Sequence, residues 1–138
     1  MTSEFQNKKI EKGHPIQNYL DETLLIRSIA DDLIQIDINN DYQKFYNLFN
    51  QLATIEKRFE RKENQFFPFL EQKGWTGPSR NMWSFHDIIR QIFRIVRQNI
   101  EDKNLSSAKH NTELTIQNIN RLLEVEEIVL FPNALEIL

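Results

Sequence analysis

The chain contains no cysteine, few residues that break helices and no long hydrophobic run. The absence of cysteine excludes disulfides and metal sites built on thiolates. No apolar run approaches the roughly 20 residues that a transmembrane helix needs, and the polar N-terminus does not resemble a signal peptide. We therefore expect a cytoplasmic protein with no membrane partner. Only 3 glycines and 4 prolines occur in 138 residues, which favours long helices.

The chain also lacks a strong excess of either charge. It has 17 Lys and Arg against 20 Asp and Glu, and a formal net charge of -3, so nothing favours a nucleic-acid partner. Hydrophobic residues make up 40% of the chain and charged residues 27%, as in ordinary globular proteins. We expect a flexible N-terminal arm over residues 1–12 and one domain over residues 13–138.

Apolar residues recur every three or four positions along four segments, which is the pattern of amphipathic helices. We predict helices at about residues 15–38, 41–72, 80–103 and 107–136, with kinks or ends at Pro68 and Pro132. No segment alternates convincingly with a period of two. The sequence thus predicts an all-α fold, an antiparallel up-down-up-down four-helix bundle. Its core is expected to contain the phenylalanines of these stripes: Phe45, Phe49, Phe59, Phe66, Phe67 and Phe93.

Polar residues interrupt the apolar stripe of every predicted helix. They are Glu22, Glu63, His86, Glu126 and Glu127. Counting residues from the predicted turns places them within roughly two helical turns of one end of the bundle, with His14 at the mouth. Carboxylates and imidazole that converge from facing helices form iron or manganese sites in bundles. Hydrated or salt-bridged polar residues at a bundle end would give the same pattern, and spacing alone leaves both interpretations open.

The second and fourth predicted helices share a short motif. Residues 62–70 read KENQFFPFL, and residues 126–134 read EEIVLFPNA. In both, a glutamate is followed by an apolar pair and then by Phe-Pro, so that Glu63 matches Glu127. Such a repeated motif is expected if both helices place a carboxylate at the same level of the bundle.

These stretches resemble a hemerythrin-like (HHE cation-binding) domain, of the variety that precedes PAS sensor domains in anaerobic and lactic bacteria. The matching segments are residues 13–16 with Glu22, residues 61–71, residues 74–90 and residues 126–138. The resemblance implies a hemerythrin-like four-helix bundle with a non-haem iron site, in a protein that senses oxygen or nitric oxide. It also implies a PAS-type sensor domain or a second copy of the chain as partner.

Carried over by position, the family motif places metal ligands at His14, Glu63, His86 and Glu127, with Glu22 and Glu126 as further candidates. Other histidines of the motif are replaced, by Gln17, Arg58 or Phe59, Arg90, and Leu122 or Leu123. The resemblance therefore implies a reduced iron site, mononuclear or weak, in a sensor or regulatory module. The alternative is a metal-free interaction module in which Arg58, Lys62 and Arg90 supply the missing positive charge.

An enzyme is not expected. No nucleophile with its base, no phosphate-binding loop and no zinc motif can be found in the sequence.

Overall fold

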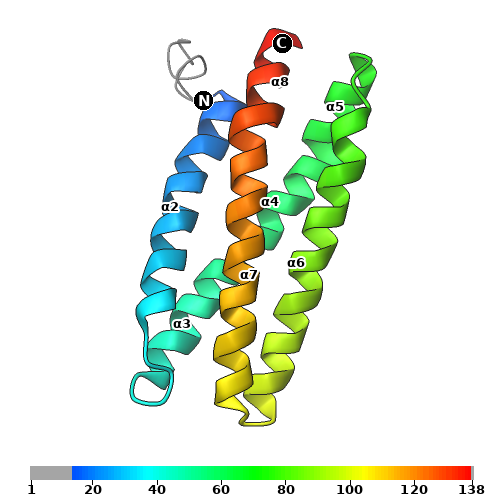
Figure 1. Ribbon diagram of the computed structural model, residues 1–138. Coiled ribbons are helices and arrows are strands. Elements are labelled where there is room, and N and C mark those ends of the chain that lie inside the picture. Colours follow the sequence, from blue (N-terminus) through cyan, green and yellow to red (C-terminus); the bar gives the residue numbers. More distant parts are fainter. Residues whose placement is uncertain (1–13, 138) are drawn as a thin grey trace.

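The computed structural model describes residues 14–137, apart from the side chains of residues 77–80. The regular structure of these residues is entirely helical (Figure 1), as the sequence predicted. The N-terminal arm expected over residues 1–12 lies outside the described residues. No helix of the described chain is long and apolar enough to cross a membrane.

The helical segments form four runs, an arrangement compatible with a four-helix bundle. The first run is α2 (Pro15–Gln35). The second comprises α3 (Tyr42–Ala53), α4 (Ile55–Arg61), the π-helical turn η1 (Lys62–Phe66) and α5 (Phe67–Gln72). The third is α6 (Gly77–Glu101), and the fourth comprises α7 (Leu105–Val125), the π-helical turn η2 (Glu126–Leu130) and α8 (Phe131–Ile137). In Figure 1 the loops 36–41 and 102–104 lie at one end, and the loop 73–76 lies at the other.

The second run is less regular than predicted. It is interrupted at Thr54, whose backbone N–H bonds to the carbonyl of Gln51 at 3.2 Å rather than following the α-helical pattern. The ends of the helices also differ from the prediction by a few residues, since α2 ends at Gln35 and α6 begins at Gly77. Such shifts are common, because helix ends depend on caps and on tertiary contacts that periodicity does not reveal.

Near both prolines at which kinks or ends were predicted, a π-helical turn interrupts the α-helix, and helical structure continues past the proline. Phe67 and Phe131 direct their N–H groups to the carbonyls of Lys62 and Glu126, five residues earlier. A proline inside an α-helix has no N–H to donate, and its ring crowds the carbonyl four residues before it. The wider π turn gives the chain one extra residue at this point, which accommodates Pro68 and Pro132.

A lysine from α7 caps the C-terminal end of α2. Lys109 donates from Nζ to the carbonyls of Leu33 at 3.0 Å, Ile34 at 2.8 Å and Ile36 at 2.8 Å. The last carbonyls of a helix have no partner within the helix and carry partial negative charge, which favours a cation there. Lys109 therefore ties the fourth run to the end of the first.

We predict that Lys109→Met lowers the free energy of unfolding by about 1–2 kcal/mol, because three carbonyls lose a charged donor while the aliphatic volume stays similar. Urea denaturation followed by circular dichroism measures the change. Lys44→Met is the matched control, since Lys44 is exposed on α3 and its loss should cost less than about 0.5 kcal/mol. Equal effects of the two exchanges would show that the cap does not contribute.

Candidate functional site

The core phenylalanines are buried as predicted, and a cluster of charged side chains is buried among them. Lys62 and Glu126 are each 0% exposed, and they occupy the first positions of η1 and η2. Each π turn thus carries its first side chain into the interior of the molecule. An unpaired charge at such depth is very costly, so the partners of these two residues decide what the site is.

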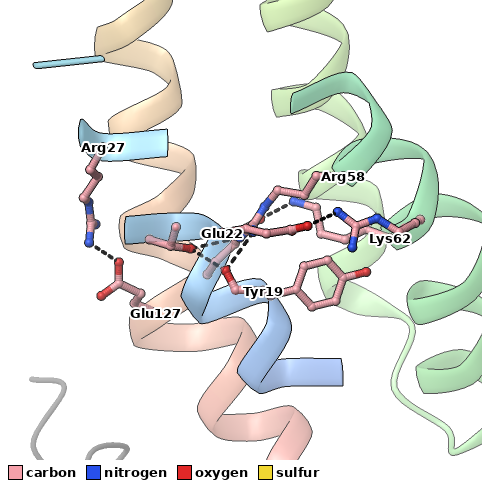
Figure 2. Close-up of polar contacts among 9 residues, drawn as sticks. Tyr19, Glu22, Arg27, Arg58, Lys62 and Glu127 are labelled. Atoms are coloured by element: carbon pink, nitrogen blue, oxygen red, sulfur yellow. Dashed lines mark hydrogen bonds and ion pairs between the residues drawn. The ribbon is translucent and has the colours of Figure 1, made fainter. Parts of the chain in front are cut away.

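Glu126 binds two cations, one through each carboxylate oxygen. Arg58 contacts Oε1 from α4, and Lys62 contacts Oε2 from η1. Arg58 is 2% exposed and also donates to the carbonyl of Tyr19 at 2.9 Å, to Oγ1 of Thr23 at 3.2 Å and to Glu22 at 3.2 Å. Figure 2 shows Arg58 beside Tyr19 and Glu22 of α2. Arg58 and Lys62 therefore do not face solvent, and both are buried against Glu126.

A second group of polar side chains joins η1 to α6. Arg90 binds Glu63 with two parallel hydrogen bonds, both 2.9 Å long, which is the bidentate geometry of strong guanidinium–carboxylate pairs. Nδ1 of His86 lies 2.7 Å from Oε2 of the same carboxylate. The His86 ring is 0% exposed and stacks on Phe59, with ring centroids 4.1 Å apart. Glu63 and His86 are thus in contact, as counting residues from the predicted turns indicated, and Arg90 joins them.

The other candidate ligands lie apart from this pair. His14 caps α2, because its Nδ1 accepts a hydrogen bond from the N–H of Ile16 at 3.1 Å. Glu127 pairs with Arg27 of α2 at 2.5 Å, nearer the surface, and Glu126 is the inward member of the glutamate pair. Glu22 is partly exposed and pairs with Arg58 and with Arg61. Among the predicted ligands, only Glu63 and His86 are in direct contact in the described part of the chain.

The two halves of the chain place their polar residues at matching positions. Lys62 and Glu126 match in the shared motif and bind each other. Arg27 and Arg90 each stand twelve residues after the proline that opens their helix, and each binds the glutamate at the second position of a π turn. Arg27 was not predicted from the sequence. The motif shared by the second and fourth helices was the available signal, because it matches Glu127, the partner of Arg27, to Glu63.

The cations determine the ionisation of the buried groups. Burial by itself raises the pKa of the Glu126 carboxyl, but Arg58 and Lys62 outweigh burial and hold that pKa below its usual value. Burial and the nearby Lys62, Arg90 and Arg58 lower the pKa of His86 far below its usual value, so the ring is neutral. A neutral His86 that donates from Nδ1 to Glu63 has its lone pair on Nε2, and this buried atom has no hydrogen-bond partner among the described residues.

Buried Lys62 makes the stability of the fold depend on pH. Burial, opposed by Glu126, lowers its pKa to about 8 from 10.5. Between these values the unfolded chain binds the Lys62 proton and the folded chain does not, so stability rises with pH across this window, by at most about 3 kcal/mol. Denaturant melts from about pH 7.5 to 10 should show this rise, and Lys62→Met should remove it. A wild-type curve that is flat or falling relative to the variant would contradict the prediction.

The side chains as arranged do not fit the iron site that the resemblance implies. Iron in such bundles binds carboxylate oxygens and imidazole nitrogens, yet both oxygens of Glu126 and both oxygens of Glu63 already bind cationic or donating side chains. Within residues 14–137 no three His, Asp or Glu side chains gather as metal ligands would. A divalent cation beside Lys62 and Arg58 would also be repelled by both.

Comparison with known proteins adds no relative. The chain matches no protein family, and it has no significant match among curated proteins or among solved structures.

Proposed function

We propose that this chain is an antiparallel, hemerythrin-like four-helix bundle that fills the place of the metal with its own cationic side chains. It would act as a metal-free interaction or regulatory module, with a PAS-type sensor domain or a second copy of the chain as its partner. The observation that carries the proposal is the complete neutralisation of Glu126, which is 0% exposed and is bound by Arg58 and Lys62.

A cation that belongs to a side chain, unlike a metal ion, is always present when the bundle folds. A metal-binding bundle must bury carboxylates that are paired only when the ion is present, so its stability depends on the ion. Here Arg58 and Lys62 are supplied by the chain itself, and Glu63 is held by Arg90. The fold therefore requires no ion, and such a bundle is suited to present a constant surface to a partner.

The surface supports an interaction role. Large apolar side chains remain exposed on it, including Leu24 at 70% and Leu25 at 63% on the same turn of α2. Single exposed apolar residues are ordinary, but adjacent ones that are mostly exposed favour a protein contact site.

Metal analysis tests the proposal directly. Protein purified without chelators should contain far less than one iron per chain, and its melting temperature should be the same with EDTA and with added ferrous iron under anaerobic conditions. A ligand that binds only the folded chain raises the melting temperature, so this measurement would detect iron binding. Iron near one atom per chain together with such a rise would reject the metal-free module.

One observation favours the iron-binding alternative, a reduced site in a sensor. Nε2 of His86 is a buried lone pair with no partner among the described residues, as a vacant ligand would be. Glu63→Gln separates the two proposals, because it should abolish iron binding to such a site. In the metal-free module the same exchange leaves the metal content unchanged and leaves Arg90, which is only partly buried, free to turn toward solvent.

A further inference from the structure

A small pocket opens beside the charge cluster, between α2 and the junction of α3 with α4. Its volume is about 120 Å³. Ile26, Ile29, Leu52 and Ile55 form an apolar wall, and Arg58 lies at the charged end. The remaining lining includes Glu22, Leu25 and Arg61, which are partly or largely exposed and connect the pocket to solvent.

The charges at this end do not balance. Arg58, Arg61 and Lys62 supply three positive charges, whereas their ion-pair partners Glu22 and Glu126 supply two negative ones. Glu63 does not correct the difference, because Arg90 already neutralises it. This group of five ion-paired side chains therefore carries one positive charge in excess, and burial strengthens the attraction of such a charge for an anion.

Arg58, which lines the pocket, also has an unused donor. Nε of Arg58 is buried and has no hydrogen-bond partner among the described residues, although the other nitrogens of the guanidinium bind four acceptors. Arg61 forms an ion pair with Glu22 at 2.5 Å, and its side chain is 38% exposed. Two arginines thus share the single, partly exposed carboxylate of Glu22, and a second carboxylate could bind beside it or replace it.

We infer that this pocket binds a small monoanion with a short apolar chain, a short-chain carboxylate. The carboxylate would bind Arg61 and the free Nε of Arg58, because guanidinium groups bind carboxylates with strong, directed hydrogen bonds. The hydrocarbon part would lie on the isoleucine and leucine wall. The volume equals about four waters at roughly 30 Å³ each, which limits the ligand to about two to four carbons. This site does not depend on whether the bundle holds metal.

Butyrate is a suitable probe, and its titration can be followed by nitrogen–proton NMR spectra at constant ionic strength. We expect saturable shifts of backbone amides in α2, α3 and α4, with a dissociation constant in the millimolar range. Chloride at the same ionic strength, and butylamine, which has a similar chain and the opposite charge, should not reproduce them. Shifts that do not saturate, or that chloride reproduces, would overturn the inference.

Two variants should change the affinity in opposite directions. Arg61→Gln removes one of the two proposed partners of the ligand and should weaken butyrate binding about tenfold. Glu22→Gln removes the competing carboxylate and should strengthen binding by a similar factor. Lys57→Gln is the matched control, because Lys57 is an exposed residue of α4 outside the pocket, and its loss should leave affinity within about twofold. Equal loss in the Arg61 and Lys57 variants would indicate general charge attraction and would overturn the site.

Discussion

Replacing Glu126 with glutamine should lower the free energy of unfolding by about 3–5 kcal/mol. The exchange keeps the size of the side chain but removes its charge, so that Arg58 and Lys62 remain buried with no anion between them. Removing one partner of a buried ion pair costs far more than the pair contributes, because the remaining charge cannot recover its hydration. The amide group of glutamine would also direct a donor toward one of the two cations, which are themselves only donors. Urea denaturation measures the loss.

The neighbouring glutamate provides the control. Glu127 pairs with Arg27 at 2.5 Å, and the Arg27 side chain is 39% exposed. Surface pairs of this kind contribute at most about 1 kcal/mol, so Glu127→Gln should cost no more than that. Similar losses in the two variants would mean that the structure assigns the inward direction to the wrong glutamate. A Glu126→Gln loss below about 1 kcal/mol would mean that Arg58 and Lys62 have other partners or reach solvent.

The choice between Glu126 and Glu127 was not predictable from periodicity. An α-helix rotates about 100° per residue, and both glutamates flank the centre of the apolar stripe. The π turn adds one residue to the helix, so positions before and after it follow different phases. In the sequence, only the Phe-Pro dipeptide after each π turn indicates where the helical periodicity of the apolar stripe shifts.

The contact between Glu63 and His86 was predictable, because both stand on regular stripes and their depths follow from counting residues from a turn. The burial of Arg58 and Lys62 was harder to predict. Lysine and arginine are almost always exposed unless a partner is buried with them, and that partner, Glu126, is separated from Lys62 by 64 residues. The four helices thus follow from local patterns, whereas the charge cluster follows from contacts between distant segments.

Truncation of Phe59 should be as damaging as the loss of Glu126, for a different reason. Phe59 is 0% exposed and stacks against the ring of His86, while Lys62 and Arg90 lie 5.4 Å and 5.5 Å from its ring centroid. It thus contacts members of both the Glu126 cluster and the Glu63 group. Phe59→Ala should lower the free energy of unfolding by about 3–5 kcal/mol, the usual cost of emptying a large buried site.

The exposed Phe69 serves as the matched control for this exchange. Its side chain is 40% exposed on α5, so Phe69→Ala removes the same atoms and should cost less than about 1 kcal/mol. The cavity left by Phe59→Ala is bounded by His86, which could then gain water and recover part of its basicity. An NMR titration of the His86 ring should therefore show a pKa nearer its usual value in the Phe59 variant than in the Phe69 variant. A loss below about 1 kcal/mol in Phe59→Ala would mean that this side chain is not a central member of the core.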